Sequence, residues 1–292
     1  MSALVLVLLL CLAAVVLVLA YWRVSRTKKV EAPWLVPEPQ QHAIVLAHGL
    51  LGFDHLHIAG TRQHYFRGVA NHLRSQGAVV LTSKVAPLGT VPERAEALSE
   101  FVREIDERRV LIIGHSMGGL DARYAISKFG LSDCVSGLVS IATPHRGSCL
   151  ADPSLPIRAM RALLGSVGVT TDAMNWLGEA SAAGFNDEVV DVPDVFYGCI
   201  VGETTRTRVA SVPMLLASYE LLLRLRGKND GLVPASSQRW GRELKVVPAH
   251  HFEQIGWSPL FDANGMYLQL LKDLNEAGYS CLPSTAQMQL TA

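Results

Sequence analysis

Short apolar segments typical of buried strands alternate along this chain with longer segments of helical pattern, and this alternation restricts the possible folds most strongly. The predicted strands are residues 43–49, 78–85, 110–113, 135–144, 195–202 and 244–249. The predicted helices are residues 62–76, 92–106, 117–129 and 262–276. Continuous apolar strands separated by helices predict an α/β fold with a mostly parallel central sheet and helices on both faces. Ligands of such sheets bind at the carboxyl ends of the strands, so we expect the functional residues there.

Residues 148–193 interrupt the alternation, because no strong strand pattern occurs among them. Met160, Leu163, Leu164 and Val167 follow the i, i+3, i+4, i+7 spacing of an amphipathic helix. Two interpretations remain open for this insertion. It is either a lid over the carboxyl ends of the strands or an ordinary packed cap helix.

The first 22 residues form a separate segment. Residues 3–20 are all apolar, and Tyr21 and Trp22 close the run. As a helix, about 20 residues span roughly 30 Å, the thickness of a bilayer core, and the aromatic pair is typical of a membrane interface. We therefore predict a transmembrane anchor at residues 1–22, followed by a proline-containing linker at residues 23–41.

A cleaved signal peptide is the alternative for this segment, but it requires positive charge before a shorter apolar run. The first basic residue is Arg23, and Arg26, Lys28 and Lys29 follow it closely. The sequence thus favours an uncleaved single-pass anchor. Positive charge gathers on the cytoplasmic side of such anchors, which predicts a cytoplasmic location for the remaining chain.

Composition excludes several classes of protein. Lys plus Arg and Asp plus Glu both total 26, so the net charge is zero, and nucleic-acid binders carry a basic excess. The five cysteines are scattered and form no C-x-x-C pair, which favours unpaired thiols in a reducing compartment over a disulfide framework or a metal site.

Ser116 is the candidate nucleophile, at the centre of a G-x-S-x-G pattern in "LIIGHSMGGLDARYA". A predicted strand precedes it and a predicted helix follows it, as a nucleophile elbow requires. Gly114 and Gly118 supply the small neighbours that so tight a turn needs. The helix N-terminus would direct N–H groups at the reaction centre. Without this context, the pattern would indicate only a glycine-rich bend.

A serine nucleophile needs a base that is held by an acid. Asp230 in "KNDGLVP" and His251 in "PAHHFEQIG" follow Ser116 in the order nucleophile, acid, base. Spacing alone leaves two alternatives open, namely Glu203 for the acid and His250 for the base.

The oxyanion that forms during acyl transfer needs two backbone donors. The N–H of Met117, directly after Ser116, is one candidate, and the N–H of Leu50 in "AHGLLGFD" is the other. We expect His48 and His115 to hold loops by hydrogen bonds. His145, at the end of a predicted strand, is a weaker candidate for direct participation.

The motifs "HGLLGFD", "GHSMGGLDARY", "ATPHRGS", "AGFN", "NDGLV" and a late "HFE" occur in this order between residues 43 and 257. Together they resemble the bacterial true lipases of the Pseudomonas and Burkholderia type. The resemblance implies an α/β-hydrolase fold over residues 42–280 with a mobile helical lid within 148–193, and a C-terminal tail at 281–292. It also implies these roles: nucleophile Ser116, acid Asp230, base His251, and oxyanion donors Leu50 and Met117. The choice of His251 over His250 rests on Glu253, two places after it.

The chain departs from these relatives at three points. Secreted members have a disulfide cysteine where this chain has Ala235, and they carry a removable signal peptide. They also bind a structural calcium through two aspartates. Glu253 occupies one of these two places and the other is not matched, so we expect no cofactor, with calcium near Glu253 left open.

The sequence therefore predicts a membrane-anchored serine carboxylester hydrolase, a lipase or esterase that forms an acyl-enzyme on lipid esters. The expected partners are an acyl-ester substrate and a membrane, and no nucleic acid. A phospholipase or acyltransferase with the same triad is an alternative, and a non-catalytic hydrolase-fold scaffold is another.

Overall fold

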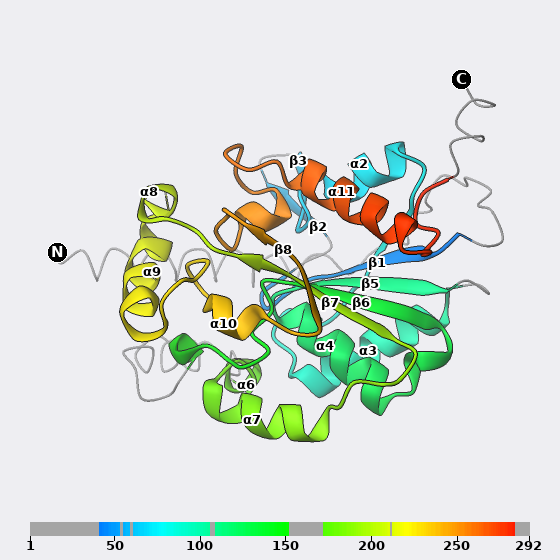
Figure 1. Ribbon diagram of the computed structural model, residues 1–292, viewed down its shortest axis with the longest axis horizontal. Helices are drawn as coiled ribbons and strands as arrows, with labels where there is room; N and C mark the ends of the chain where they lie inside the picture. Colours follow the sequence, from blue (N-terminus) through cyan, green and yellow to red (C-terminus); the bar gives the residue numbers. More distant parts are fainter. Residues whose placement is uncertain are drawn as a thin grey trace.

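The computed structural model describes residues 41–52, 55–58, 61–105, 109–151, 172–210 and 212–283. Within these ranges the chain builds a six-stranded sheet of order β4-β1-β5-β6-β7-β8, in which every neighbouring pair is parallel (Figure 1). Its strands are β1 (Ala43–Ala47), β4 (Val79–Thr82), β5 (Val110–His115), β6 (Val135–Ile141), β7 (Phe196–Gly202) and β8 (Arg242–Val247). The six predicted strands and the predicted parallel sheet are confirmed.

Two pairs of helices cover the two faces of this sheet (Figure 1). α2 (Val69–Ser75) and α11 (Ala263–Glu276) pack on one face, and α3 (Val91–Arg103) and α4 (Met117–Lys128) pack on the other. α3 begins with a capping box between Thr90 and Glu93, which satisfies backbone donors of its first turn. The predicted helices at 92–106, 117–129 and 262–276 are confirmed.

The apolar core is divided into two layers by the sheet. Successive residues of a strand face opposite sides, so Ile44 and Leu46 of β1 join the layer under α2 and α11, whereas Ala43 and Val45 join the layer under α3 and α4. All five residues of β1 are buried. A strand that is covered on both faces has no polar side, which is why this segment shows no alternation in the sequence.

One helix prediction is wrong in its first half. Residues 62–76 were expected to form a single helix, but Thr61–His64 form the strand β3, which pairs antiparallel with β2 (His55–Ile58). Only the second half is helical, as α2. Each strand of this hairpin needs the other for its backbone hydrogen bonds, and the local pattern of residues gives no sign of that pairing.

The helix α9 (Pro213–Arg226) was not predicted from the sequence pattern. Its buried residues Leu215, Tyr219 and Leu222 follow helical spacing. However, Leu223 and Leu225 are apolar and exposed, so the apolar residues surround the helix and give no clear stripe. Such a segment lacks the periodicity on which helix prediction rests. A one-turn helix, α8 (Arg206–Val209), precedes it.

The predicted insertion at 148–193 is described in part. It begins with a short 3-10 turn, η2 (Cys149–Ala151), and continues in α6 (Asp172–Asn175) and α7 (Glu179–Glu188). Ala173 and Phe185 pack against Met117 and Leu120 of α4, so this part of the insertion covers the helix that follows Ser116. The predicted amphipathic helix from Met160 to Val167 lies outside the described residues, and the lid stays a prediction.

Both ends of the predicted catalytic domain are packed together. The Nε2 of Gln41 donates to the carbonyls of Gly77 and Cys281 at 2.9 Å and 3.2 Å, and Cys281 is fully buried. Residues assigned to the linker and the tail by sequence thus contribute to the fold at its two borders. The predicted anchor at 1–22 lies outside the described residues, and among those that are described no helix has the length and hydropathy to cross a membrane.

Candidate active site

Ser116 lies at the sharp turn between β5 and α4, with φ of 55° and ψ of −129°. This backbone conformation is strained for a residue with a side chain, and such strain is typical of functional positions. The turn leaves no space for side chains around it. A Cβ on Gly118 would lie 2.3 Å from the carbonyl oxygen of Ala47, and one on Gly114 would lie 2.7 Å from the Cα of Gly119. The chain therefore passes from strand to helix as a nucleophile elbow does.

His251 and Asp230 are brought together although they lie on different loops. The Nδ1 of His251 is 2.8 Å from Oδ2 of Asp230, and the backbone N–H of His251 donates to the Asp230 carbonyl at 2.9 Å. An ionised carboxylate only accepts, so the imidazole proton is on Nδ1 and Nε2 is left as an acceptor. The arrangement thus gives the imidazole the tautomer that a general base needs.

The Asp230 carboxylate is itself held by the turn that carries it. Its Oδ1 accepts hydrogen bonds from the N–H groups of Leu232 at 2.9 Å and Val233 at 2.7 Å. Asp230 is fully buried, and burial of a carboxylate requires such donors. The carboxylate is therefore fixed in orientation before any substrate binds.

The two competing residues lie in other environments. Glu203 accepts hydrogen bonds from Lys228 at 2.7 Å and from Arg239 at 3.3 Å near the surface. The ring of His250 faces Glu253, with 3.9 Å between its Nε2 and Oε1 of the carboxylate. The structure therefore joins His251 to Asp230, whereas Glu203 is paired with Lys228 and Arg239 and His250 lies beside Glu253.

Leu50 and Met117, the candidate oxyanion donors, flank the elbow on two sides. The loop that bears Leu50 passes very close to Ser116, since a Cβ on Gly49 would lie 2.8 Å from the Cβ of Ser116. Neither the N–H of Leu50 nor that of Met117 donates to an acceptor within the described ranges. Both backbone donors are thus available to a substrate oxygen.

A buried ion pair behind this loop is absent from the sequence-based candidates. The guanidinium of Arg94 donates to the carbonyl of His48 at 2.6 Å, to that of Ala86 at 2.8 Å, and to the carboxylate of Asp121 on α4 at 2.9 Å. Both charged side chains are almost fully buried. Arg94 therefore ties the loop of Leu50 to the helix that begins after Ser116. The sequence signal that could have revealed this pair is the position of Arg94 and Asp121 among the apolar residues on the buried faces of α3 and α4.

The other histidines near the site have structural contacts. The Nε2 of His145 is 2.9 Å from Oγ of Ser140, and its ring stacks on Trp240. No hydrogen bond links His145 to the triad candidates in the described part of the chain. The Nδ1 of His48 is 3.0 Å from the Gly49 carbonyl, and His115 contacts both Tyr65 and the main chain of His251.

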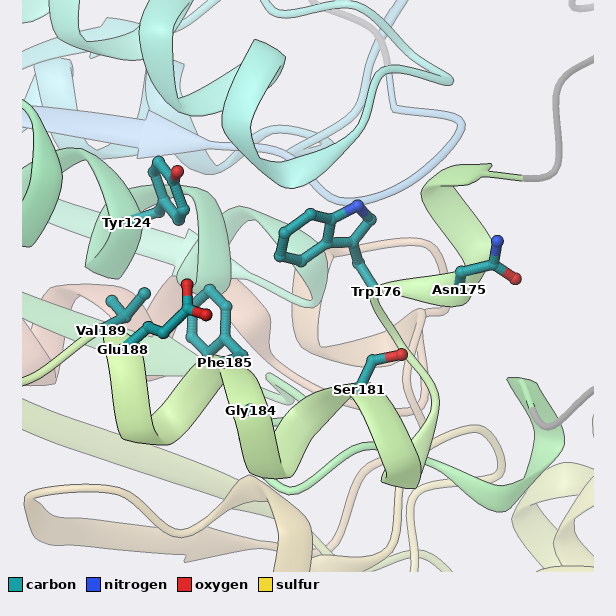
Figure 2. A pocket seen from close by; sticks show the side chains of 8 residues that line it. All are labelled: Tyr124, Asn175, Trp176, Ser181, Gly184, Phe185, Glu188 and Val189. Atoms are coloured by element: carbon teal, nitrogen blue, oxygen red, sulfur yellow. The ribbon is translucent and has the colours of Figure 1, made fainter.

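A pocket of about 270 Å³ lies between α4 and the cap segment. Figure 2 shows Trp176 and Tyr124 above α7, on which Ser181, Phe185 and Glu188 lie. None of the triad candidates lines it. The pocket is therefore lined by Tyr124 of α4 and by residues 175–189 of the insertion.

The residues around Glu253 do not fit a structural calcium. Its Oε2 accepts hydrogen bonds from Nε of Arg208 at 3.2 Å and from the N–H of His250 at 2.8 Å, and its Oε1 accepts from Ser258 at 3.3 Å. Calcium needs six to eight oxygen ligands, whereas here one carboxylate faces a guanidinium. Throughout the ranges described, no group of three or more His, Cys, Asp or Glu side chains could hold a metal.

Comparison with known proteins agrees with this fold. The model of the alpha/beta hydrolase family matches residues 44–263, and the chain therefore belongs to the alpha/beta hydrolase family. The expectation of an enzyme of the hydrolase class is confirmed, and so is the resemblance to triacylglycerol lipases, through the relatives described next.

Three sequence relatives illustrate the resemblance. Triacylglycerol lipase 2 of Saccharomyces cerevisiae is 29% identical over 310 residues, which cover 83% of this chain and 94% of the yeast protein. A triacylglycerol lipase of Vibrio cholerae is 37% identical over 116 residues, or 38% of this chain and 35% of that protein. The lipase of Burkholderia plantarii is 32% identical over 123 residues, which cover 38% and 32%. The bacterial matches thus span about a third of those proteins.

Solved structures show the same fold at lower identity. The mature lipase BlEst2 of Bacillus licheniformis superposes with a TM-score of 0.65 and 22% identity, over 83% of this chain and 95% of that one. The lipase of Staphylococcus hyicus gives a TM-score of 0.64 and 16% identity, over 84% and 98%. The predicted α/β-hydrolase fold is confirmed.

Proposed function

We propose that this protein is a serine carboxylester hydrolase, a lipase or esterase that cleaves acyl esters of lipids. The observation that supports this most strongly is the pairing of His251 with Asp230 at 2.8 Å, on loops that follow the same sheet edge as Ser116. Its relatives named as triacylglycerol lipases support a lipid ester as the substrate class.

In the proposed mechanism the Oγ of Ser116 attacks the acyl carbonyl carbon of the ester, and Nε2 of His251 accepts the hydroxyl proton. Asp230 keeps the imidazole oriented and stabilises the imidazolium. The N–H groups of Leu50 and Met117 bind the oxyanion of the tetrahedral intermediate. His251 then protonates the leaving alcohol, an acyl-serine remains, and water activated by His251 releases the fatty acid.

The first prediction concerns Ser116. We expect Ser116→Ala to lower ester hydrolysis by more than about 10³-fold while the thermal unfolding midpoint stays close to that of the unchanged protein. A fluorophosphonate probe should label the unchanged protein and leave the variant unlabelled. Unreduced hydrolysis by Ser116→Ala would refute the mechanism, and failure of the probe to label the unchanged protein would favour the scaffold alternative.

The same assay identifies the group that accepts the acyl chain, which is either water or an alcohol. Released fatty acid, measured beside acyl transfer to an added alcohol, distinguishes a hydrolase from an acyltransferase. Esters of graded chain length and phospholipids, offered in parallel, distinguish a lipase or esterase from a phospholipase.

Attachment to a membrane through residues 1–22 is also part of the proposal. The uninterrupted apolar run at residues 3–20 and the basic residues from Arg23 onward support it. In this arrangement the catalytic domain lies on the cytoplasmic side and acts on esters at or near the membrane surface.

A further inference from the structure

Tyr65 belongs to no motif considered so far, yet its hydroxyl lies beside Gly49 and His115, the neighbours of Leu50 and Ser116. A Cβ placed on Gly49 would be 2.8 Å from the Tyr65 oxygen and 2.8 Å from the Cβ of Ser116. The Tyr65 oxygen is 2.7 Å from Nδ1 of His115, the residue before Ser116. The other ring nitrogen of His115, Nε2, is 3.1 Å from the backbone carbonyl oxygen of His251.

The directions of these hydrogen bonds follow from which groups can donate. The His251 carbonyl only accepts, so Nε2 of His115 carries a proton. Burial, together with the nearby His251, holds the pKa of His115 well below its usual value, so the ring is neutral and Nδ1 has no proton. The hydroxyl of Tyr65 must therefore donate to Nδ1 of His115.

The Tyr65 oxygen also has a backbone hydrogen bond with Gly49, which lowers the pKa of the phenol against the stronger effect of burial that raises it. Only a donor stabilises the phenolate in this way, so Gly49 contributes its N–H. A single ordered chain results: Gly49 N–H to Tyr65, Tyr65 O–H to His115, and His115 N–H to the carbonyl of His251.

We infer that Tyr65 and His115 are positioning residues of the reaction. They join the loop of Gly49 and Leu50 to the loop of His251, on the buried side of Ser116. The inference rests on the proposed function. One end of the chain is Gly49, directly before the candidate donor Leu50. The other end is the main chain of His251, the candidate base.

This chain fixes two things that acyl transfer needs at the same time. With the Gly49 N–H taken by Tyr65, the next peptide N–H, that of Leu50, is the one left for the substrate oxygen. The bond from His115 anchors the backbone of His251, whose ring centroid lies 4.6 Å from that of His115. Small displacements of reacting groups cost large factors in rate, so loss of the chain should act on turnover.

Tyr65→Phe tests the inference because it removes one oxygen and keeps the ring. Tyr267→Phe is a matched control, because Tyr267 is also buried and its hydroxyl has no hydrogen-bond partner among the described residues. With a short-chain nitrophenyl ester and the full-length protein, we expect Tyr65→Phe to lower kcat about tenfold and to change KM by less than about twofold. Tyr267→Phe should leave both constants unchanged.

A double-mutant cycle with His115→Gln tests whether Tyr65 acts through His115. In the His115→Gln background, most of the effect of Tyr65→Phe on kcat should disappear. Equal kcat for Tyr65→Phe and Tyr267→Phe, or fully additive losses in the cycle, would overturn the inference. Either result leaves the proposed function standing as long as Ser116→Ala is inactive, whereas activity in Ser116→Ala refutes the proposed function itself.

Discussion

At the scale of single residues, the candidate site depends on groups that are buried and already oriented. Asp230 has three hydrogen-bond donors, from His251, Leu232 and Val233. The absence of side chains at Gly114 and Gly118 leaves room for the strained conformation of Ser116. Preorganised dipoles and nucleophiles of this kind need no rearrangement during reaction. Arg94 is oriented in the same way, because its buried guanidinium donates to the His48 carbonyl in the loop of Leu50 and to Asp121 of α4.

Arg94→Gln should damage both stability and turnover. It removes the partner of the buried Asp121 carboxylate, and breaking a buried ion pair typically costs about 3–5 kcal/mol. It also removes the donors to the carbonyls of His48 and Ala86, so kcat should fall as well. Urea unfolding gives the free energy, and Arg103→Gln on the same helix is the control, because the hydrogen bonds of Arg103 within the described ranges go to Ser99 and Phe129, near the surface. Equal stability of the two variants would contradict the prediction.

The pH dependence of this loss follows from Asp121. Burial raises the pKa of its carboxyl to about 6, from 3.8, against the opposing effect of Arg94. The folded state therefore binds this proton more tightly than the unfolded state, and its contribution to the free energy of unfolding falls as the pH rises from about 4 to 6. Without Arg94 the pKa of Asp121 should be higher still, so this decline in the free energy of unfolding should continue above pH 6. The difference in the free energy of unfolding between the unchanged protein and Arg94→Gln should therefore be larger at about pH 8 than at about pH 5.

At the scale of elements, the loop that carries His251 is fixed by an ion pair in the place that the lipase resemblance assigns to calcium. Arg208 of α8 contacts Glu253 in the turn η3 (Glu253–Ile255), at 3.2 Å. The Glu253 carboxylate is fully buried and Arg208 is only 24% exposed, so the pair is well shielded from solvent. The guanidinium of Arg208 thus connects α8 to the turn η3, and it supplies the positive charge that a bound cation would supply.

Calcium should therefore have no effect on the unchanged protein: neither EDTA nor added Ca²⁺ should shift its thermal unfolding midpoint. Arg208→Asp places a second carboxylate beside Glu253, where oxygen ligands could gather around a cation. We expect this variant to have a lower midpoint that rises with added Ca²⁺. Arg206→Asp makes the same charge change on a side chain that is 76% exposed and paired with Glu220, and it should show no calcium response. A calcium-dependent midpoint in the unchanged protein would refute this assignment.

At the scale of the whole molecule, the parallel sheet explains how distant residues meet. Ser116 follows β5, Asp230 follows β7 in the chain, and His251 follows β8. Because all strands of the main sheet run in one direction, their carboxyl ends share an edge, and the loops at that edge can combine residues from three parts of the sequence.

The anchor predicts how the full-length protein distributes in cells. The intact chain should remain with the membrane fraction after a high-salt wash, because burial of an apolar helix is insensitive to ionic strength. A chain without residues 1–22 should be released and retain its specific activity on a short-chain ester. Protease added to the cytoplasmic side should digest the catalytic domain. A domain that resists protease until the membrane is opened would contradict the cytoplasmic orientation.

The sequence by itself determined the α/β class and the six strands, and it named the candidate residues Ser116, Asp230 and His251, since apolar runs and motif order are local properties of the chain. Ser116 was identifiable because its elbow requires glycines at fixed neighbouring positions. The hairpin β2–β3 and the helix α9 were not, because strand pairing and burial on several faces depend on distant parts of the chain.

Only the tertiary structure decided between alternatives that are equivalent in sequence. Spacing could not choose between His251 and His250, or between Asp230 and Glu203, because each pair follows the same strand end. The fold turns one histidine toward Asp230 and the other toward Glu253. Likewise, the Arg94–Asp121 pair and the chain from Tyr65 to His251 join residues far apart in sequence. Such contacts arise from packing, and no local pattern encodes them.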